Sequence, residues 1–305
     1  MSLFRTLFGR PLATSEESEQ RVSPIAGVPI LGLDALSSAS YGPEAALTIL
    51  MPLAATGLVY IRGTTAILLL LLAALYFSYR QTLAAYPNGG GAYTVAKENL
   101  SKSAGLVAGA SLLVDYVLNV AVAISAGVGA LESAIPAFHK ERFPICLLAL
   151  GMITFVNLRG VRDSGVAWSA PTYAFVVSLL TVIGVGIWKT LLSGGHPVPV
   201  AMPPPLPPAS ESVSAWLIIR SFASGCTAMT GVEAVANGVP IFAEPKVKNA
   251  QRTLTIICAL LALLLAGVVY LAGAYHVGAL SQDHPGYQSV ISQIVAAVAG
   301  RGMFY

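Results

Sequence analysis

The sequence predicts an all-α membrane protein whose chain crosses the bilayer several times, and three observations lead to this prediction. Of its 305 residues, 55% are apolar and only 10% are charged, whereas a soluble domain carries about 25% charge. The apolar residues gather in stretches of the length that a helix needs to span a bilayer, which is about 20 residues. A short pattern containing glycine and glutamate also occurs twice inside such stretches.

By that length, the chain contains seven spans in succession. Their approximate bounds are residues 25–56, 64–86, 103–133, 143–158, 165–192, 213–242 and 254–277. A proline-rich stretch at residues 196–212 separates the fifth span from the sixth, and its composition is typical of an extended, solvated connector. Four segments follow from this reading, namely a tail at residues 1–24, a five-helix repeat at 25–192, an extracytoplasmic loop at 193–212 and an incomplete second repeat at 213–305.

The basic residues orient these spans in the membrane. Eleven lysines and arginines fall in the tail and in the loops on its side of the membrane, against five on the other side. Because basic loops stay in the cytoplasm, we expect a cytoplasmic N-terminus in the cell's inner membrane. Residues 1–24 are polar and charged, with no apolar core of a cleavable signal peptide.

The repeated pattern reads Ser-Ala-Ser-Tyr-Gly-Pro-Glu-Ala at residues 38–45 and Thr-Ala-Met-Thr-Gly-Val-Glu-Ala at residues 227–234. Five spans separate the two copies, so the second copy enters the membrane upside down. Paired broken helices in inverted repeats form the binding sites of many secondary transporters. We therefore expect unwound turns at Gly42 and Gly231, with the first break near residues 41–43. Because the second repeat is incomplete, we also expect a longer parent protein.

Acidic side chains lie inside the spans, where each costs about 2.5–3.5 kcal/mol on insertion scales. They are Asp34, Glu44, Asp115 and Glu233. A structural role remains open for each: Asp34 and Asp115 could pair with an arginine or the backbone, and Glu44 could favour the dipole of a local helix.

Several polar residues share helix faces with these acids. Tyr41 follows Asp34 by two helical turns, and Asn119 follows Asp115 by one. Tyr116 adjoins Asp115, Thr230 precedes the expected second break, and Tyr41 and Thr230 occupy the same place in the two copies. Buried hydroxyls also bond often to helix carbonyls, so each of these residues is a weak signal by itself.

The chemistry of this set favours a cation. An unwound turn frees backbone carbonyls, and carboxylate, hydroxyl and carbonyl oxygens are hard ligands for alkali or alkaline-earth ions. Two or three acids around one monovalent ion leave excess negative charge, so one of them is expected to bind a proton, with Glu233 and Asp115 as candidates. The predicted ligands are Asp34, Tyr41, Asp115, Tyr116, Asn119, Thr230 and Glu233.

Other functions have little support in the sequence. Cys146, Cys226 and Cys258 form neither a disulfide framework nor a metal-ligand spacing. The Asn-Gly-Gly-Gly stretch at residues 88–91 lacks the ending of a phosphate-binding loop and is expected to form a tight turn or re-entrant segment. Without a nucleophile and base, we expect no enzyme and no cofactor or resident metal. The net charge of +3 lies in loops and does not indicate nucleic-acid binding.

Two loop motifs carry a family resemblance. Pro-Asn-Gly-Gly-Gly-Ala-Tyr at residues 87–93 and Phe-Ala-Glu-Pro-Lys-Val-Lys-Asn-Ala at residues 242–250 resemble the amino acid–polyamine–organocation (APC) superfamily. This resemblance implies the LeuT-like fold of five plus five inverted helices, here truncated after about seven, with broken first and sixth helices.

Within that superfamily the chain resembles KimA-type bacterial potassium importers of the KUP group. Asp34 with Tyr41, Asp115 with Tyr116, and Thr-Gly-Val-Glu at residues 230–233 carry this resemblance. It implies proton-coupled potassium import by alternating access and a homodimer formed through a soluble C-terminal domain. The chain departs from the family in that Asn119 replaces a hydroxyl ligand and a tyrosine expected on helix eight lies beyond residue 305.

The resemblance leaves alternatives open. An amino-acid permease on the same fold would have to bind a carboxylate, which the intramembrane acids would repel. A channel would use carbonyl loops or charged rings around an oligomer axis, which internal inverted repeats do not provide. The favoured hypothesis is a transporter for a small inorganic cation, potassium, in the lipid bilayer.

Overall fold

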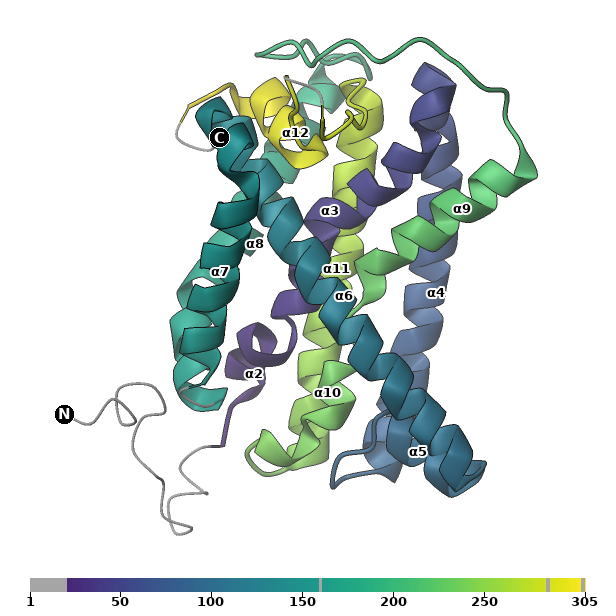
Figure 1. Ribbon diagram of the computed structural model, residues 1–305, viewed down its shortest axis with the longest axis vertical. Helices are drawn as coiled ribbons and strands as arrows, with labels where there is room; N and C mark the ends of the chain where they lie inside the picture. Colours follow the sequence, from purple (N-terminus) through teal and green to yellow (C-terminus); the bar gives the residue numbers. More distant parts are fainter. Residues whose placement is uncertain (1–20, 159–160, 284–285, 303–304) are drawn as a thin grey trace, which may run out of the picture.

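The computed structural model of the protein describes residues 21–158, 161–283, 286–302 and 305. The expected tail lies outside the described residues up to position 20. Within the described ranges the chain is almost entirely helical and forms no strand, apart from an isolated bridge between Val22 and Phe242. Most of the longer helices run along the long axis of the molecule, with α6 crossing them obliquely (Figure 1).

The α-helices match the seven predicted spans closely, with short helices added between and after them. They are α2 (Pro24–Leu31), α3 (Leu33–Leu50), α4 (Gly57–Ala85), α5 (Ala92–Asn99), α6 (Lys102–Ala134), α7 (Arg142–Asn157), α8 (Val161–Leu192), α9 (Ala215–Gly225), α10 (Ala234–Asn237), α11 (Lys246–Ala274) and α12 (Val290–Ala299). Short 3-10 helices follow α3, α6, α9 and α10: η2 (Met51–Thr56), η3 (Pro136–Glu141), η4 (Cys226–Met229) and η5 (Val239–Ile241).

Among the residues that the structure describes, four helical stretches are long and apolar enough to cross a membrane, which confirms a multi-pass membrane protein. They are Leu33–Ala85, Lys102–Ala134, Trp168–Leu192 and Lys246–Ala274. The proline-rich connector is extended, as predicted, and reaches across one end of the bundle, where the backbone N–H of Ser210 bonds to the carbonyl of Pro52 at 2.9 Å. We call this end, which also carries α12, the α12 end, and the opposite end the α2 end (Figure 1).

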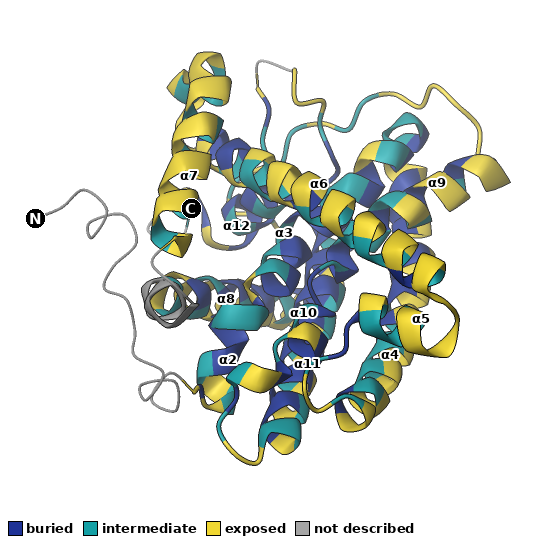
Figure 2. Cartoon of the chain, turned by 60° about the horizontal axis from the view of Figure 1, so that its bottom comes forward, coloured by how far each residue is buried: buried dark blue, intermediate teal, exposed yellow. Residues whose placement is uncertain are grey.

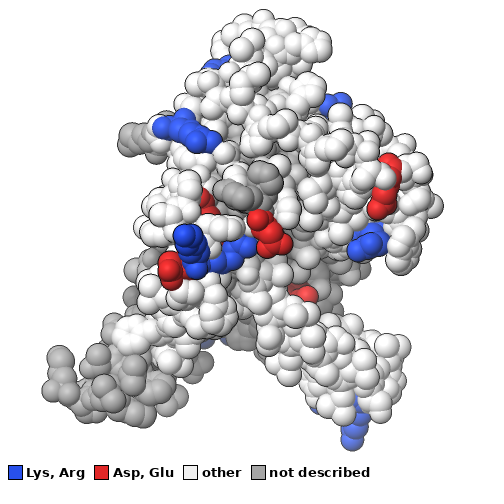
Figure 3. Space-filling model, turned by 45° about the horizontal axis from the view of Figure 1, so that its top comes forward, with Lys and Arg blue, Asp and Glu red and all other residues white. Residues whose placement is uncertain are grey.

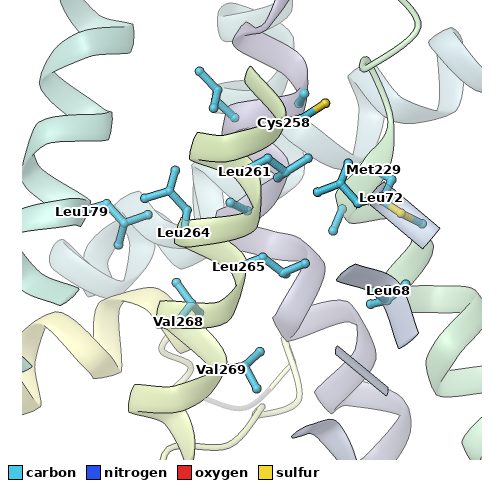
Figure 4. Packing of buried hydrophobic residues seen from close by; sticks show 14 of the residues in the cluster. Leu68, Leu72, Leu179, Met229, Cys258, Leu261, Leu264, Leu265, Val268 and Val269 are labelled. Atoms are coloured by element: carbon cyan, nitrogen blue, oxygen red, sulfur yellow. The ribbon is translucent and has the colours of Figure 1, made fainter. Parts of the chain in front are cut away.

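Helix α11 lies at the centre of the core because its sequence is apolar on nearly every face. Its residues Leu261, Leu264 and Leu265 are at most 1% exposed. Figure 4 shows them between Leu68 of α4 on one side and Leu179 of α8 on the other. Helices α3 and α11 form the buried middle of the bundle, whereas α6 and α7 lie at its surface and expose apolar side chains (Figure 2). Such a surface is typical of helices that face hydrocarbon.

Charged side chains are sparse on the surface as well. Figure 3 shows them in a few small groups, some with acidic and basic side chains side by side, on a face that is otherwise uncharged. This distribution agrees with the low charge content of the sequence.

The predicted break of the first span near residues 41–43 is wrong. Helix α3 continues through Tyr41, Gly42 and Pro43, and the span is interrupted at Gly32 instead, between α2 and α3. Gly42 serves close packing: a Cβ atom there would lie 2.5 Å from the Cβ of Ala228 in η4. A glycine inside an apolar span therefore indicated a helix contact rather than an unwound turn.

The predicted break of the sixth span is confirmed. Helix α9 ends at Gly225, η4 follows, and the chain is not helical at Thr230 and Gly231 before α10 begins. Gly231 has φ +83°, a left-handed conformation that glycine adopts without strain. The repeated pattern thus aligns a helical segment with an unwound one, so Tyr41 and Thr230 are not equivalent in structure, nor are Glu44 and Glu233.

Serine hydroxyls fasten α3 to the sixth span. Ser221 and Ser224 of α9 donate to the carbonyls of Ala46 and Ala45 at 3.1 and 3.0 Å, respectively. Ser38 of α3 donates to the carbonyl of Ala228 at 3.1 Å. Together with the contact between Gly42 and Ala228, these bonds hold α3 in close contact with α9 and η4.

An ion pair joins α6 to the start of α7 at the α12 end. The Glu132 side chain is 2% exposed, and its two oxygens accept from Nε and Nη2 of Arg142, each at 2.6 Å. Removing one partner of such a pair leaves an uncompensated buried charge, which costs about 3–5 kcal/mol. Arg142→Gln is therefore expected to lower the free energy of unfolding by about 3 kcal/mol, the lower end of that range, because Arg142 is partly exposed.

The melting temperature of the purified protein in detergent checks this expectation. Arg21→Gln is the matched control, since Arg21 pairs with the exposed Glu244 at 3.7 Å and exposed pairs contribute at most about 1 kcal/mol. Equal shifts for both variants would contradict a structural role of the buried pair.

Candidate functional site

The two interrupted spans meet near the middle of the bundle. The interruption at Gly32 places Asp34 in the first turn of α3, where the partial positive charge of a helix N-terminus favours a carboxylate. The break at Gly231 lies directly against it, because a Cβ atom at Gly231 would be 2.6 Å from Oδ2 of Asp34. Only a glycine lets the unwound backbone approach this carboxylate so closely.

Asn119 of α6 is the centre of a hydrogen-bonded group at this point. Its Nδ2 donates to Oδ1 and Oδ2 of Asp34, each at 2.6 Å. Its Oδ1 accepts from the hydroxyls of Tyr41 and Thr230, each at 3.1 Å. One amide side chain thus connects α3, α6 and the unwound turn. We refer to Asp34, Tyr41, Asn119 and Thr230 as the central polar cluster.

A second group of polar side chains lies beside the central polar cluster. Glu233 is 8% exposed, and its Oε1 has no hydrogen-bond partner among the described residues. Tyr116 of α6 and Tyr79 of α4 are near enough to Glu233 to interact electrostatically with its carboxylate. The hydroxyl of Tyr116 accepts from Nδ2 of Asn237 at 3.4 Å.

Asp115 is half-buried on α6, one turn before Asn119. Its negative charge lies close enough to interact with those of Asp34 and Glu233. Within the described part of the chain, no lysine or arginine forms an ion pair with any of these three acids. The site is therefore anionic and lacks a basic side chain to balance its charge.

All seven predicted ligand residues fall within these two neighbouring groups. Asp34, Tyr41, Asn119 and Thr230 are joined by direct hydrogen bonds, while Asp115, Tyr116 and Glu233 lie close enough to one another to interact electrostatically. Of the two glycines predicted to be unwound, Gly231 lines the site and Gly42 does not. Glu44 also lies apart from the site and bonds to Tyr287 and Val290.

Sequence reasoning missed Tyr79 and Asn237. Tyr79 stands in α4 among other aromatic residues, and Asn237 ends the four-residue helix α10. The only available signal was the presence of a hydroxyl and an amide in apolar spans, which buried polar groups with purely structural roles share. Asn237 lies beside the glycine turn, since the N–H of Gly90 bonds to the carbonyl of Ala236 at 3.2 Å.

The arrangement offers oxygen atoms rather than a transition-metal site. In the ranges that the structure describes, no three His, Cys, Asp or Glu residues come together as a metal cluster. The available groups are carboxylates, phenol and alcohol hydroxyls, one amide oxygen and the carbonyls of the unwound turn, which suit hard cations. The excess of negative charge favours a positively charged ligand, and the unpartnered Oε1 of Glu233 can accept a proton.

Comparison with known proteins adds to this geometry. The family model described as amino acid permease matches residues 35–304. The chain is 42% identical over 304 residues to the potassium transporter KimA of Bacillus subtilis (strain 168), covering 100% of this chain and 49% of that protein. It is 24% identical over 198 residues to the low-affinity putrescine importer PlaP of Escherichia coli (strain K12), covering 65% of this chain and 41% of that one. The chain thus spans about half the length of these relatives or less.

Proposed function

The chain belongs to the amino acid permease family, a family of membrane transporters, and from this premise we propose that it imports potassium ions coupled to protons. The observation that carries the proposal is the central polar cluster: a helix break, a carboxylate and a bridging amide meet, and no lysine or arginine among the described residues pairs with the carboxylate. In an inverted-repeat transporter, substrate sites form at such broken helices near the bilayer midplane.

Potassium fits this cluster by the nature of its ligands. A cation that has lost its water needs several oxygen atoms, which carboxylate, hydroxyl, amide and backbone carbonyl groups supply. The 42% identity to a potassium transporter over the whole chain supports the same choice.

An amino acid is a poorer fit, although the family's name suggests one. Its carboxylate would meet the charges of Asp34, Asp115 and Glu233, and none of them forms an ion pair with a described lysine or arginine. A diamine carries only positive charge and remains a cationic competitor, which the experiment below includes.

Coupling to protons follows from the surplus of acids around one monovalent ion. Glu233 is the proposed proton carrier because it is buried and its Oε1 lacks a partner; Asp115 is the second candidate. The proposed orientation has a cytoplasmic N-terminus in the inner membrane, which places the α12 end outside and the α2 end inside.

Potassium uptake into proteoliposomes that contain the full-length protein tests the proposal. We expect uptake that an inward proton gradient accelerates and that excess putrescine or amino acids leave unchanged. Glu233→Gln is expected to lose this acceleration and to retain at most about a tenth of the uptake rate, a loss of 1.4 kcal/mol or more. The exposed Glu98→Gln is the control and is expected to behave like the wild type.

Growth of a bacterium without potassium uptake systems gives a second readout. Rescue at low potassium by the wild type, and its loss in Asp115→Asn with the protein still present in the membrane, supports the proposal. Uptake of putrescine or of an amino acid without any potassium uptake would overturn it.

A further inference from the structure

A cavity of about 300 Å³ lies on the α12 side of the central polar cluster. Helices α3 and α6 form two of its walls, and the segment before α12 forms a third. Its lining residues include Tyr41, Glu44, Thr48, Ser125, Gln282 and Tyr287. Residues that carry hydroxyl, amide and carboxylate groups therefore line a space that is large enough for an ion and several waters.

Glu44 is the one acidic side chain among the described residues that line this cavity. Its Oε1 accepts from the hydroxyl of Tyr287 at 2.7 Å, and its Oε2 accepts from the backbone N–H of Val290 at 3.0 Å. Both donors are neutral. In the described ranges, no lysine, arginine or histidine forms an ion pair with Glu44.

Arg142, a basic residue at this end, is already paired. Arg142 binds both oxygens of Glu132, and its guanidinium stands over the ring of Tyr287, 5.7 Å from the ring centre. It thus helps to position Tyr287 without reaching Glu44. An ionised carboxylate has about four lone-pair positions, so two hydrogen bonds leave Glu44 able to bind a cation from the cavity.

Tyr41, a member of the central polar cluster, also lines this cavity. Its side chain forms part of the cavity wall, while its hydroxyl donates to Oδ1 of Asn119 at 3.1 Å. Glu44 follows Tyr41 by about one helical turn on α3. One aromatic residue therefore connects the cavity that Glu44 lines with Asn119 of the central polar cluster.

We propose that the cavity is a second cation site, in which Glu44 binds a monovalent alkali ion before it passes Tyr41. The oxygens of Ser125 and Gln282, which line the same space, complete the ligand set together with water. This inference rests on the proposed potassium transport and adds an entry site with its own residues, distinct from the central polar cluster.

A rival role for Glu44 is purely mechanical. Its two hydrogen bonds tie α3 to α12, and α12 is also tied to α6, since the backbone N–H of Ser289 donates to Oγ of Ser133 at 2.9 Å. If Glu44 only held α3 against α12, removing its negative charge in Glu44→Gln and removing the hydroxyl of its partner in Tyr287→Phe would have the same effect on uptake.

Uptake kinetics of the full-length protein separate these roles. Glu44→Gln removes the charge and keeps the shape, and is expected to raise the KM for potassium at least about tenfold with little change in kcat, since weaker ground-state binding raises KM alone. Tyr287→Phe keeps the carboxylate and is expected to change KM far less. Glu44→Asp keeps the charge and is expected to restore part of the affinity. Equal effects of Glu44→Gln and Tyr287→Phe, or an unchanged KM in Glu44→Gln, would overturn the proposal.

Cysteine protection provides a readout without transport. Ser125→Cys in a protein whose native cysteines, Cys146, Cys226 and Cys258 among them, are replaced by alanine places an exposed thiol in the cavity wall. Potassium is expected to slow its reaction with a water-soluble thiol reagent at least about twofold, also when Asp34→Asn disables the central polar cluster. Glu44→Gln is expected to abolish this protection. The proposed entry site is contradicted if protection persists in Glu44→Gln, or if potassium gives no protection in the Ser125→Cys protein that keeps Glu44.

The two proposals can fail separately. If the wild type transports no potassium, the proposed function fails, whatever the cysteine result. If the wild type transports potassium with an unchanged KM in Glu44→Gln, only the entry site fails.

Discussion

Asp34→Asn is expected to lower potassium uptake at least about 100-fold, which corresponds to about 2.7 kcal/mol. The carboxylate of Asp34 accepts twice from Nδ2 of Asn119 at 2.6 Å and faces the unwound turn at Gly231. Hydrogen bonds to charged groups contribute about 1.5–3 kcal/mol each. The asparagine side chain lacks the negative charge that a bare cation needs. It also turns an N–H group toward Asn119 or the ion.

Initial uptake rates in proteoliposomes measure this effect, with protein content and melting temperature recorded for each variant. Glu211→Gln is the matched control because it removes an equal charge from an exposed position in the proline-rich connector. It is expected to stay within twofold of the wild type. If Asp34→Asn folds normally and keeps more than half of the uptake, the central polar cluster is not the cation site.

Gly231→Ala is expected to have a smaller but still large effect on uptake, which acts through the backbone. Gly231 has φ +83°, and a side chain in the left-handed region costs about 1–2 kcal/mol. The added Cβ atom would also lie 2.6 Å from Oδ2 of Asp34, so the turn or the carboxylate must move. We expect uptake to fall at least about tenfold, which corresponds to 1.4 kcal/mol or more.

The control for this variant is Gly127→Ala on α6. A Cβ atom at Gly127 would meet no other atom within 4 Å, and alanine favours a helix over glycine by about 1 kcal/mol. It is expected to preserve uptake and to match or exceed the wild type in melting temperature. Normal uptake in Gly231→Ala would show that the close approach of the unwound turn to Asp34 is not needed.

The sequence was sufficient to predict the fold class and the approximate spans. Span length and apolar content follow from the thickness of the bilayer, so α4, α6 and α11 could be located without knowing their neighbours. The sequence also predicted the break at Thr230 and Gly231, where a glycine two residues before an acid interrupts an apolar stretch, although the same pattern at Gly42 does not break its helix. Helix periodicity correctly placed Asp34 and Tyr41 on one face, where both bind Asn119.

Tertiary contacts decided what the sequence could not. The glycine at position 42 lies in the same local pattern as Gly231, and only the contact with Ala228 distinguishes a packing glycine from an unwound one. The interruption at Gly32 was overlooked because Gly32 lies outside the repeated pattern, although Asp34 follows it at the same spacing as Glu233 follows Gly231. The role of Asn119 as a bridge depends on three helices whose approach no single segment encodes.

The fastening of α3 to the sixth span has a consequence for how access could alternate. Three serine hydroxyls bind carbonyls across this contact, and each such bond between membrane helices contributes about 0.6 kcal/mol. Because Gly42 also packs against Ala228, α3 and α9 should move together as one rigid body. Bending would then occur at Gly32 and Gly231, so that the short helices α2 and α10 move at the α2 end while the packing of α3 against α9 is kept.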